Sequence, residues 1–132
     1  MAKPPFPAEL VDLLKKPNPA VMATLRADGT PVTVATWYLL EDDGRILLNL
    51  SATRKRLDHL RRDPRISLTV LDEASWYRHL SMQGTVIKLE DDPDLAGIDR
   101  LAMHYNGRPY GNRHAARVNA WMDVESYHYW GE

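Results

Sequence analysis

The sequence predicts a mainly β domain in which six antiparallel strands close into a small barrel. Six segments are rich in β-branched and aromatic residues, and short turns typical of hairpins separate most of them. Only two or three segments have apolar residues at helical spacing, so few helices are available as crossovers for a parallel sheet. A chain of 132 residues is long enough for one domain, and we assign residues 1–132 to it.

The first part of the chain is predicted to form a short helix and then a meander of three strands over residues 20–51. The segment "FPAELVDLLKKPN" has a helical apolar stripe, and Pro17 ends it. The segments "AVMATLR" and "VTVATWYLL" flank Asp28-Gly29, which is a strong hairpin signal. A second turn, "EDDGR", leads into the third strand, "ILLNLS".

The second part is predicted to contain two helices and three further strands. The first helix is expected from about Arg54 to Arg62, and the strands "RISLTVL" and "WYRHLSMQGTVIKLE" follow it. Gly84 interrupts the longer strand and fits a bulge or a tight corner of a barrel. The next helix is expected to have Asp92 as its N-cap and Pro93 at its first position. A loop, "RPYGNRHAAR", then precedes a final strand over residues 118–130.

The charge of the chain is balanced overall but concentrated locally. With 17 basic and 18 acidic residues, the sequence lacks the basic surplus that nucleic-acid-binding domains usually show. However, six Lys and Arg residues fall within Ser51–Arg65. We therefore expect a small anionic ligand and no nucleic acid as the partner of this stretch.

Several kinds of site are not predicted from the residues. The chain contains no cysteine, which fits a reducing cytoplasm, and no run of about 20 apolar residues that could span a membrane. The five histidines lack the spacing of metal ligands, so we expect no metal site. We find no nucleophile elbow, P-loop or dinucleotide-binding turn, and we assign no catalytic residue. If the protein is an enzyme, we expect the reactive atoms to belong to a cofactor.

The basic stretch contains a candidate anion site. Arg54, Lys55 and Arg56 lie at the predicted start of a helix, where exposed N–H groups already create a positive potential. Three cations at that position are more easily tolerated if an anion binds there, and Ser51 and Thr53 add hydroxyl donors. The alternative, a solvated basic surface, remains open and is what we expect for the other arginines of the run.

The order of these segments resembles the split-barrel flavin and deazaflavin oxidoreductases, the superfamily of pyridoxamine 5′-phosphate oxidase. The most specific parts are "ATLRADGTPVTVATWY", "TRKRLDHLRRDPR" and "SMQGTV", and the resemblance extends over about residues 8–130. Within the superfamily, the sequence is most similar to the actinobacterial group of enzymes that depend on F420, a deazaflavin coenzyme. The resemblance implies a homodimer of six-stranded split barrels with two cofactor sites at its interface.

The resemblance also implies which residues contact the cofactor. The residues expected beside its phosphate are Asn49, Ser51, Arg54, Lys55 and Arg56. The residues expected beside its ring system are Val34, Ala35, Thr36 and Trp37, with Gln83 and Gly84 facing the same site. The charge of Lys55 could serve the oligoglutamate tail of F420. The residues of the 105–117 loop that could form a substrate opening are Tyr105, Arg108, Tyr110 and Arg113.

The function implied is reduction of an electron-poor small molecule, such as an enone, a quinone or a tetrapyrrole, by hydride transfer from reduced F420. One alternative keeps the fold and replaces F420 with FMN, in an oxidase or a flavin reductase. Another is a non-catalytic carrier of a flavin, a deazaflavin or a haem-derived molecule. The balanced charge makes nucleic-acid binding the least favoured interpretation.

Overall fold

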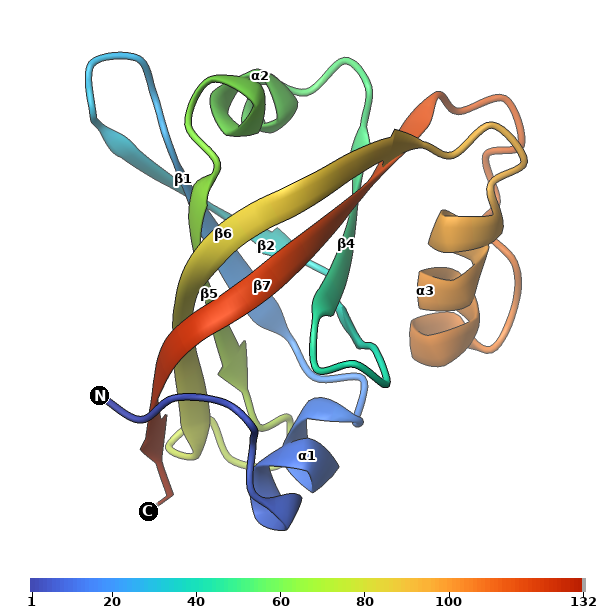
Figure 1. The fold of residues 1–132 in the computed structure, drawn as a ribbon. Helices are drawn as coiled ribbons and strands as arrows, with labels where there is room; N and C mark the ends of the chain where they lie inside the picture. The colour runs from blue at the N-terminus through green and yellow to red at the C-terminus, as the bar shows by residue number, and fades with distance from the viewer. Residues whose placement is uncertain (132) are drawn as a thin grey trace.

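The computed structural model describes residues 1–131 and contains one strongly curved antiparallel sheet of seven strands with three helices around it (Figure 1). The strands are β1 (Ala20–Leu25), β2 (Pro31–Thr36), β3 (Leu39–Leu40), β4 (Ile46–Ser51), β5 (Arg65–Leu71), β6 (His79–Asp91) and β7 (Arg117–Trp130). The helices are α1 (Ala8–Leu14), α2 (Lys55–Arg62) and α3 (Ala96–Asn106). The prediction of a mainly β antiparallel fold is confirmed.

The barrel is closed by a single segment of the chain. The strand order is β2-β1-β5-β6-β7-β4-β3, so β2 and β3 form the two edges of the sheet although only Trp37 and Tyr38 separate them in sequence. Residues 31–36 pair with β1, and residues 39–40 pair with β4. We predicted this segment as one strand of six, and the structure divides it into two strands of seven. The two antiparallel hairpins predicted within residues 20–51 form, but they are not one three-stranded meander, because β2 and β3 lie at opposite edges of the sheet.

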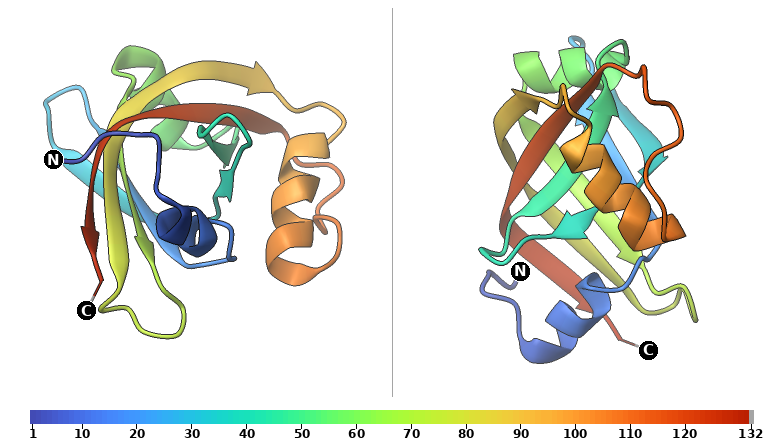
Figure 2. Two further views of the ribbon diagram at one scale, coloured as in Figure 1. Left: turned by 60° about the horizontal axis from the view of Figure 1, so that its bottom comes forward. Right: turned by 90° about the vertical axis from the view of Figure 1, so that its right-hand side faces the viewer.

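The core fills the interior of the barrel and extends under two helices. Side chains of β1 and β5 alternate between buried and partly exposed, which is the pattern of strands with one face on a core. The apolar residues of α1 and α2 that join this core are Leu10, Leu13, Leu14, Leu57 and Leu60. Figures 1 and 2 show these two helices at opposite ends of the barrel, where they cover its openings.

The third helix lies beside the barrel and begins later than the sequence suggested. Figures 1 and 2 show α3 alongside the sheet, where its buried residues Leu95, Ile98 and Leu101 form a second small apolar cluster. The prediction of a start at Pro93 was wrong, because Leu95 has a left-handed backbone (φ 61°) and the helix begins at Ala96. Asp92 nevertheless caps α3, since its carboxylate accepts hydrogen bonds from N–H groups of the first turn.

No helix among residues 1–131 is long and apolar enough to cross a membrane.

Gly84 lies at an irregularity in the pairing of β6 and β7, as the prediction of a bulge indicated. The register of the two strands shifts between Gln83 and Gly84. A Cβ atom added at Gly84 would lie 2.0 Å from the backbone carbonyl oxygen of Asp123 in β7. Only glycine permits this approach.

We predict that Gly84→Ala will lower the free energy of unfolding by about 3 kcal/mol, because a backbone carbonyl in a paired strand cannot move aside cheaply. Urea denaturation followed by circular dichroism measures this change. Gly111→Ala is the control, since a Cβ at Gly111 meets nothing within 4 Å, and we expect it to change stability by less than about 0.5 kcal/mol. Similar stabilities of the two variants would contradict the close approach at Gly84.

The Tyr105 side chain joins α3 to the segment before β1. Its hydroxyl donates a hydrogen bond to the carbonyl oxygen of Asn18 (2.7 Å) and accepts one from the backbone N–H of Tyr38 (3.3 Å). Burial raises the pKa of Tyr105 to about 12, and burial also raises the pKa of Tyr38. The folded protein therefore keeps both phenols neutral at pH values where an unfolded chain ionises them.

This burial predicts a loss of stability in alkali. A raised folded-state pKa contributes stability that is fully present below the unfolded pKa of about 10 and is lost as pH rises through the folded value near 12. We expect Tyr105→Phe to be about 1 kcal/mol less stable at neutral pH and to lose less stability than the wild type between pH 10 and 12. Urea denaturation across this pH range measures both effects. Tyr77→Phe is the matched control because Tyr77 is 58% exposed, and an unchanged alkaline slope in Tyr105→Phe would refute the assignment.

Candidate functional site

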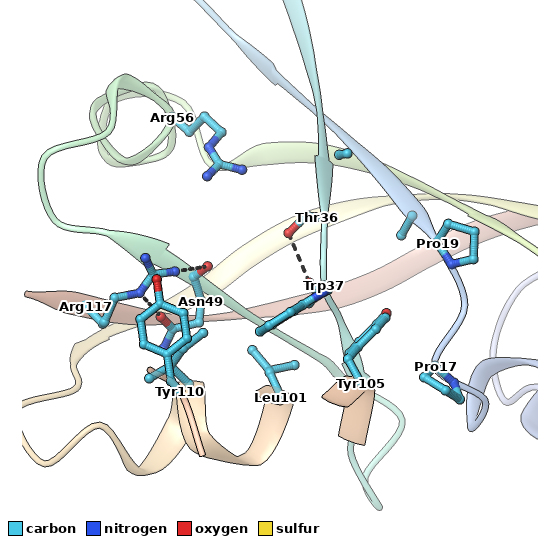
Figure 3. A pocket seen from close by; sticks show the side chains of 13 residues that line it. Pro17, Pro19, Thr36, Trp37, Asn49, Arg56, Leu101, Tyr105, Tyr110 and Arg117 are labelled. Carbon is cyan, nitrogen blue, oxygen red and sulfur yellow. Dashed lines mark hydrogen bonds between the residues drawn. The ribbon is translucent and has the colours of Figure 1, made fainter. Parts of the chain in front are cut away.

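A cavity of about 540 Å³ opens between the barrel and α3 (Figure 3). It lies where the chain leaves β2 and turns toward β3. The start of β1 and the start of β7 also border it. The residues that line it are Pro17, Pro19, Ala20, Ala35, Thr36, Trp37, Asn49, Arg56, Ile98, Leu101, Tyr105, Tyr110 and Arg117. Its volume is within the usual range for sites that bind small molecules or cofactors.

One side of the cavity is apolar and aromatic. Trp37 stacks on Tyr105 with 5.2 Å between ring centroids and an angle of 14° between the ring planes. Ile98 and Leu101 of α3 add an aliphatic surface, and Trp37 packs against the cluster that they form. Trp37 is free to take this position because it lies between β2 and β3 and belongs to neither strand. Such a wall suits a planar apolar group.

The opposite side carries two arginines, Arg56 of α2 and Arg117 of β7. Figure 3 shows both guanidinium groups on one side of the cavity, with Trp37 in the middle and Tyr105 on the other side. Within residues 1–131, neither arginine forms an ion pair with a carboxylate. The polar contact of Arg56 is a long one, 3.5 Å from Nη1 to the sulfur of Met22.

Arg117 is held more firmly than Arg56. Its Nε donates to Oδ1 of Asn49 (2.8 Å), and its Nη2 donates to the backbone carbonyl of the same residue (3.2 Å). The ring of Tyr110 covers the guanidinium, with 5.3 Å from the guanidinium carbon to the ring centroid. These contacts fix the plane of the guanidinium group.

The local electrostatics favour a bound anion. Burial lowers the pKa of Arg56, and the charges of Arg54 and Arg117 lower it further. Burial also lowers the pKa of Arg117, where the charge of Arg54 acts in the same direction and Tyr110 and Asp92 oppose it. Arginine remains protonated at neutral pH despite such shifts. Two half-buried cations without carboxylate partners are costly, and an anion between them would reduce that cost.

The structure brings together some of the predicted cofactor-binding residues but not all. The five that line the cavity are Ala35, Thr36, Trp37, Asn49 and Arg56. The predicted residues that do not line it are Val34, Ser51, Arg54, Lys55, Gln83 and Gly84. Their contacts with a cofactor stay predictions.

The predicted residues outside the cavity lie in three places. Val34 packs against the barrel core. Ser51 ends β4, and its hydroxyl is 3.0 Å from that of Thr53, while Arg54 and Lys55 are exposed at the start of α2. Gln83 and Gly84 line a separate cavity of about 340 Å³ beside β1 and β5. There, Oε1 of Gln83 is buried without a hydrogen-bond partner in the described part of the chain.

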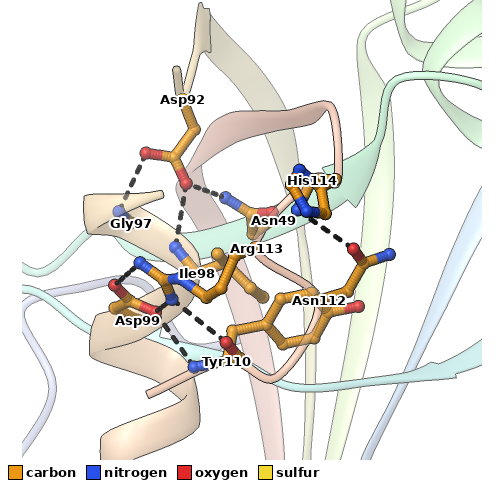
Figure 4. A network of polar contacts seen from close by, with 9 residues as sticks. All are labelled: Asn49, Asp92, Gly97, Ile98, Asp99, Tyr110, Asn112, Arg113 and His114. Atoms are coloured by element: carbon orange, nitrogen blue, oxygen red, sulfur yellow. Dashed lines mark hydrogen bonds and ion pairs between the residues drawn. The ribbon is translucent and has the colours of Figure 1, made fainter. Parts of the chain in front are cut away.

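The loop after α3 contributes Tyr110 to the cavity but turns its arginines elsewhere. Arg113 forms an ion pair with Asp99 of α3 (2.7 Å), and the backbone N–H of Tyr110 donates to the same carboxylate (3.0 Å). Arg108 is exposed and does not line the cavity. Figure 4 shows these contacts between the loop and α3. They hold Tyr110 in the position from which its ring covers Arg117.

Arg117 is the important residue that sequence reasoning missed. We predicted Arg117 in the loop before the final strand, whereas β7 begins with Arg117 paired to Ser51. One signal could have revealed it: the apolar strands "ILLNLS" and "VNAWM" each contain an asparagine, and Asn49 and Asn119 pair directly. A buried asparagine in an apolar strand indicates a polar network, because its amide needs hydrogen-bond partners on neighbouring segments.

The residues of this site suit binding rather than acid–base or metal catalysis. Within residues 1–131, no group of three or more His, Cys, Asp or Glu side chains could hold a metal ion. Among the residues that the structure describes, no carboxylate or imidazole lines the cavity. The arrangement can bind a molecule that has an anionic group at one end and a planar ring at the other.

Comparisons with known proteins identify what this chain is similar to. A protein-family model described as pyridoxamine 5′-phosphate oxidase matches residues 6–131. A solved F420 reductase is 26% identical to this chain with a TM-score of 0.84, and the match covers 93% of this chain and 98% of that one. The protein Rv2991 from Mycobacterium tuberculosis is 25% identical with a TM-score of 0.78, over 98% of this chain and 86% of the other. A search among curated proteins found no match.

A more distant structure supports the fold alone. HupZ from Group A Streptococcus is 17% identical with a TM-score of 0.71, and the match covers 97% of this chain and 96% of that chain. Since the family model extends over nearly the whole sequence and the solved structures share the fold, the chain belongs to the pyridoxamine 5′-phosphate oxidase family of split β-barrels.

Proposed function

We propose that the protein is an oxidoreductase that binds the deazaflavin F420 in the cavity beside α3 and reduces an electron-poor small molecule such as an enone, a quinone or a tetrapyrrole. The observation that carries this proposal is the position of Arg56 and Arg117, opposite the stacked rings of Trp37 and Tyr105. Neither arginine has a carboxylate partner within residues 1–131. F420 has both features that this arrangement would recognise, a phosphate and a planar ring system. The similarity to an F420 reductase supports the same coenzyme.

Each side of the cavity has its own part in this function. Arg56 and Arg117 bind the phosphate, and their planar donor groups match its oxygens. Trp37 and the aliphatic residues of α3 form a wall for the ring system and exclude water from it. Bound F420 supplies the hydride, and the protein orients the acceptor against it. The exposed Arg54 and Lys55 lie outside the cavity, where they could meet the anionic tail of the coenzyme.

Among residues 1–131, no carboxylate or imidazole that could give a proton lines the cavity. Tyr105 lines it, but its hydroxyl already donates to the carbonyl of Asn18, and burial raises its pKa to about 12. Thr36 similarly donates to the carbonyl of Trp37 (3.0 Å). We propose that water gives the proton that accompanies hydride transfer.

The proposal includes a homodimer in the cytoplasm, with cofactor sites at the interface. Support comes from the side of β1, β5 and β6 that faces away from the core, where most side chains are small and all are only partly exposed. The residues there are Val21, Ala23, Ser67, Thr69, Ser81 and Gln83. Small side chains on a sheet permit close approach of a second copy, which would supply an edge of the site.

FMN is the second candidate coenzyme, because the two arginines recognise a phosphate that FMN also carries. It would make the protein an oxidase or a flavin reductase. A non-catalytic carrier is the third candidate, favoured by a cavity in which residues 1–131 place no carboxylate or imidazole. It differs from both enzymes in showing no turnover.

We expect Arg56→Met and Arg117→Met each to weaken F420 binding by about 10- to 100-fold, the usual effect of losing a hydrogen bond to a charged group. Fluorescence titration of the purified protein with F420 and, separately, with FMN measures this. Arg61→Met is the matched control, because Arg61 is an exposed arginine of the same helix as Arg56 and does not line the cavity. The melting temperature of Arg56→Met should stay within a few degrees of wild type, since no ion pair is lost.

Each other result leads to a different conclusion. Tighter binding of FMN than of F420 would favour the flavin enzymes. Tight binding without reduction of any enone, quinone or tetrapyrrole tested would favour a carrier. If neither coenzyme binds, or if both arginine variants bind as well as Arg61→Met, the proposed site is wrong.

A further inference from the structure

We infer that Asp92 is a positioning residue for the anion site, and this inference rests on the proposed function. Asp92 does not line the cavity. It acts through Asn49, whose side chain lies between the Asp92 carboxylate and the Arg117 guanidinium (Figures 3 and 4). The charge on Asp92 therefore determines how an arginine on the other side of Asn49 is presented to a ligand.

Three hydrogen bonds converge on the Asp92 carboxylate, which is only 4% exposed. Oδ1 accepts from the backbone N–H of Gly97 (3.0 Å). Oδ2 accepts from the backbone N–H of Ile98 (2.9 Å) and from Nδ2 of Asn49 (3.1 Å). All three partners are donors, so both terminal atoms of the side chain at this position must be hydrogen-bond acceptors.

The amide of Asn49 has one orientation that satisfies its neighbours. Its Nδ2 donates to Asp92 and to Oδ1 of Asn119 (2.7 Å), and its Oδ1 accepts from Nε of Arg117. If the amide rotated by half a turn, its oxygen would face the carboxylate and its NH₂ group would face the guanidinium. Both contacts would be repulsive. A charged Asp92 thus holds the Asn49 oxygen toward Arg117.

Arg117 in turn is left with free donors on the side of the cavity. Nε and Nη2 are used by Asn49, and no hydrogen bond of Nη1 occurs within residues 1–131. The Tyr110 ring covers one face of the guanidinium. The group is therefore fixed in its plane, and this preorganisation lets it bind an anion with less loss of conformational freedom.

The Asp92 carboxylate also positions the first turn of α3, which forms part of the apolar side of the cavity. Its two backbone partners, Gly97 and Ile98, are in the first turn of α3, and Ile98 lines the cavity. Gly97 has no room for a side chain, since an added Cβ would lie 1.9 Å from Oδ1 of Asn119. Asp92 therefore connects the apolar and basic sides of the site, and ligand binding should stabilise the docking of α3 in return.

Asp92→Asn tests this role with almost no change of volume. An asparagine at this position has only one oxygen for the three donors, so its NH₂ group must face at least one N–H. It also removes the charge that orients Asn49. Asp94→Asn is the matched control, because Asp94 is an exposed carboxylate close to the same helix start and no hydrogen bond of its side chain occurs within residues 1–131.

The first measurement needs no ligand. Hydrogen exchange of the Arg117 Nε–H, followed by NMR, reports its hydrogen bond to Asn49 directly. We expect slow exchange in the wild type and in Asp94→Asn, and exchange faster by about tenfold or more in Asp92→Asn. Unchanged exchange in Asp92→Asn would overturn the inference.

The second measurement is a double-mutant cycle on F420 affinity. We expect Asp92→Asn to weaken F420 binding about tenfold in the wild type and less than about twofold when Arg117→Met is already present. Equal losses in the two backgrounds would mean that Asp92 only supports the fold, and would contradict a positioning role. Asp94→Asn should leave the affinity within about twofold of wild type in either background.

Asn49→Ala keeps the test decisive if Asp92→Asn folds poorly. This change removes the link to Arg117 while the hydrogen bonds of Asp92 to Gly97 and Ile98 remain. It should speed exchange of the Arg117 Nε–H and weaken F420 binding as Asp92→Asn does, and a normal affinity would overturn the inference. If the wild type binds neither F420 nor FMN, the proposed function fails, and the exchange measurement still decides whether Asp92 positions Arg117.

Discussion

The structure depends on one segment of chain that closes the barrel from both sides. Residues 31–36 complete the ladder with β1, and residues 39–40 start the ladder with β4. Between them, Trp37 and Tyr38 belong to no ladder, so Tyr38 can fill the core while Trp37 lines the cavity. Tyr105 packs on both rings and thereby holds α3 beside this junction. The cavity is thus a direct consequence of how the sheet closes.

Burial without a carboxylate partner distinguishes Arg56 and Arg117 from the other arginines of residues 1–131. Several of the others have carboxylate partners: Arg65 pairs with Asp63, Arg78 with Asp72, and Arg113 with Asp99. Those pairs are exposed on the arginine side and contribute little stability. Arg56 and Arg117 are more buried and lack such partners within residues 1–131. A phosphate bound between Arg56 and Arg117 would supply the negative charge that these two arginines lack.

The sequence predicted the parts of this structure that local chemistry determines. Asp28-Gly29 specified the first hairpin, and the break at Gly84 matched a close approach of two strands. The start of α3 could not be predicted, because Asp92 caps it across a loop and not from the adjacent position. Arg117 was missed because its partner Asn49 is 68 residues away, and strand register over that separation is decided by tertiary packing.

The central claim is that Arg56 and Arg117 together bind the phosphate of the coenzyme. A crystal structure of the protein with bound F420 tests it most directly. The account predicts phosphate oxygens within hydrogen-bond distance of both guanidinium groups, with the ring system against Trp37. A phosphate held by the exposed arginines of α2, with the cavity beside α3 left without coenzyme, would contradict it.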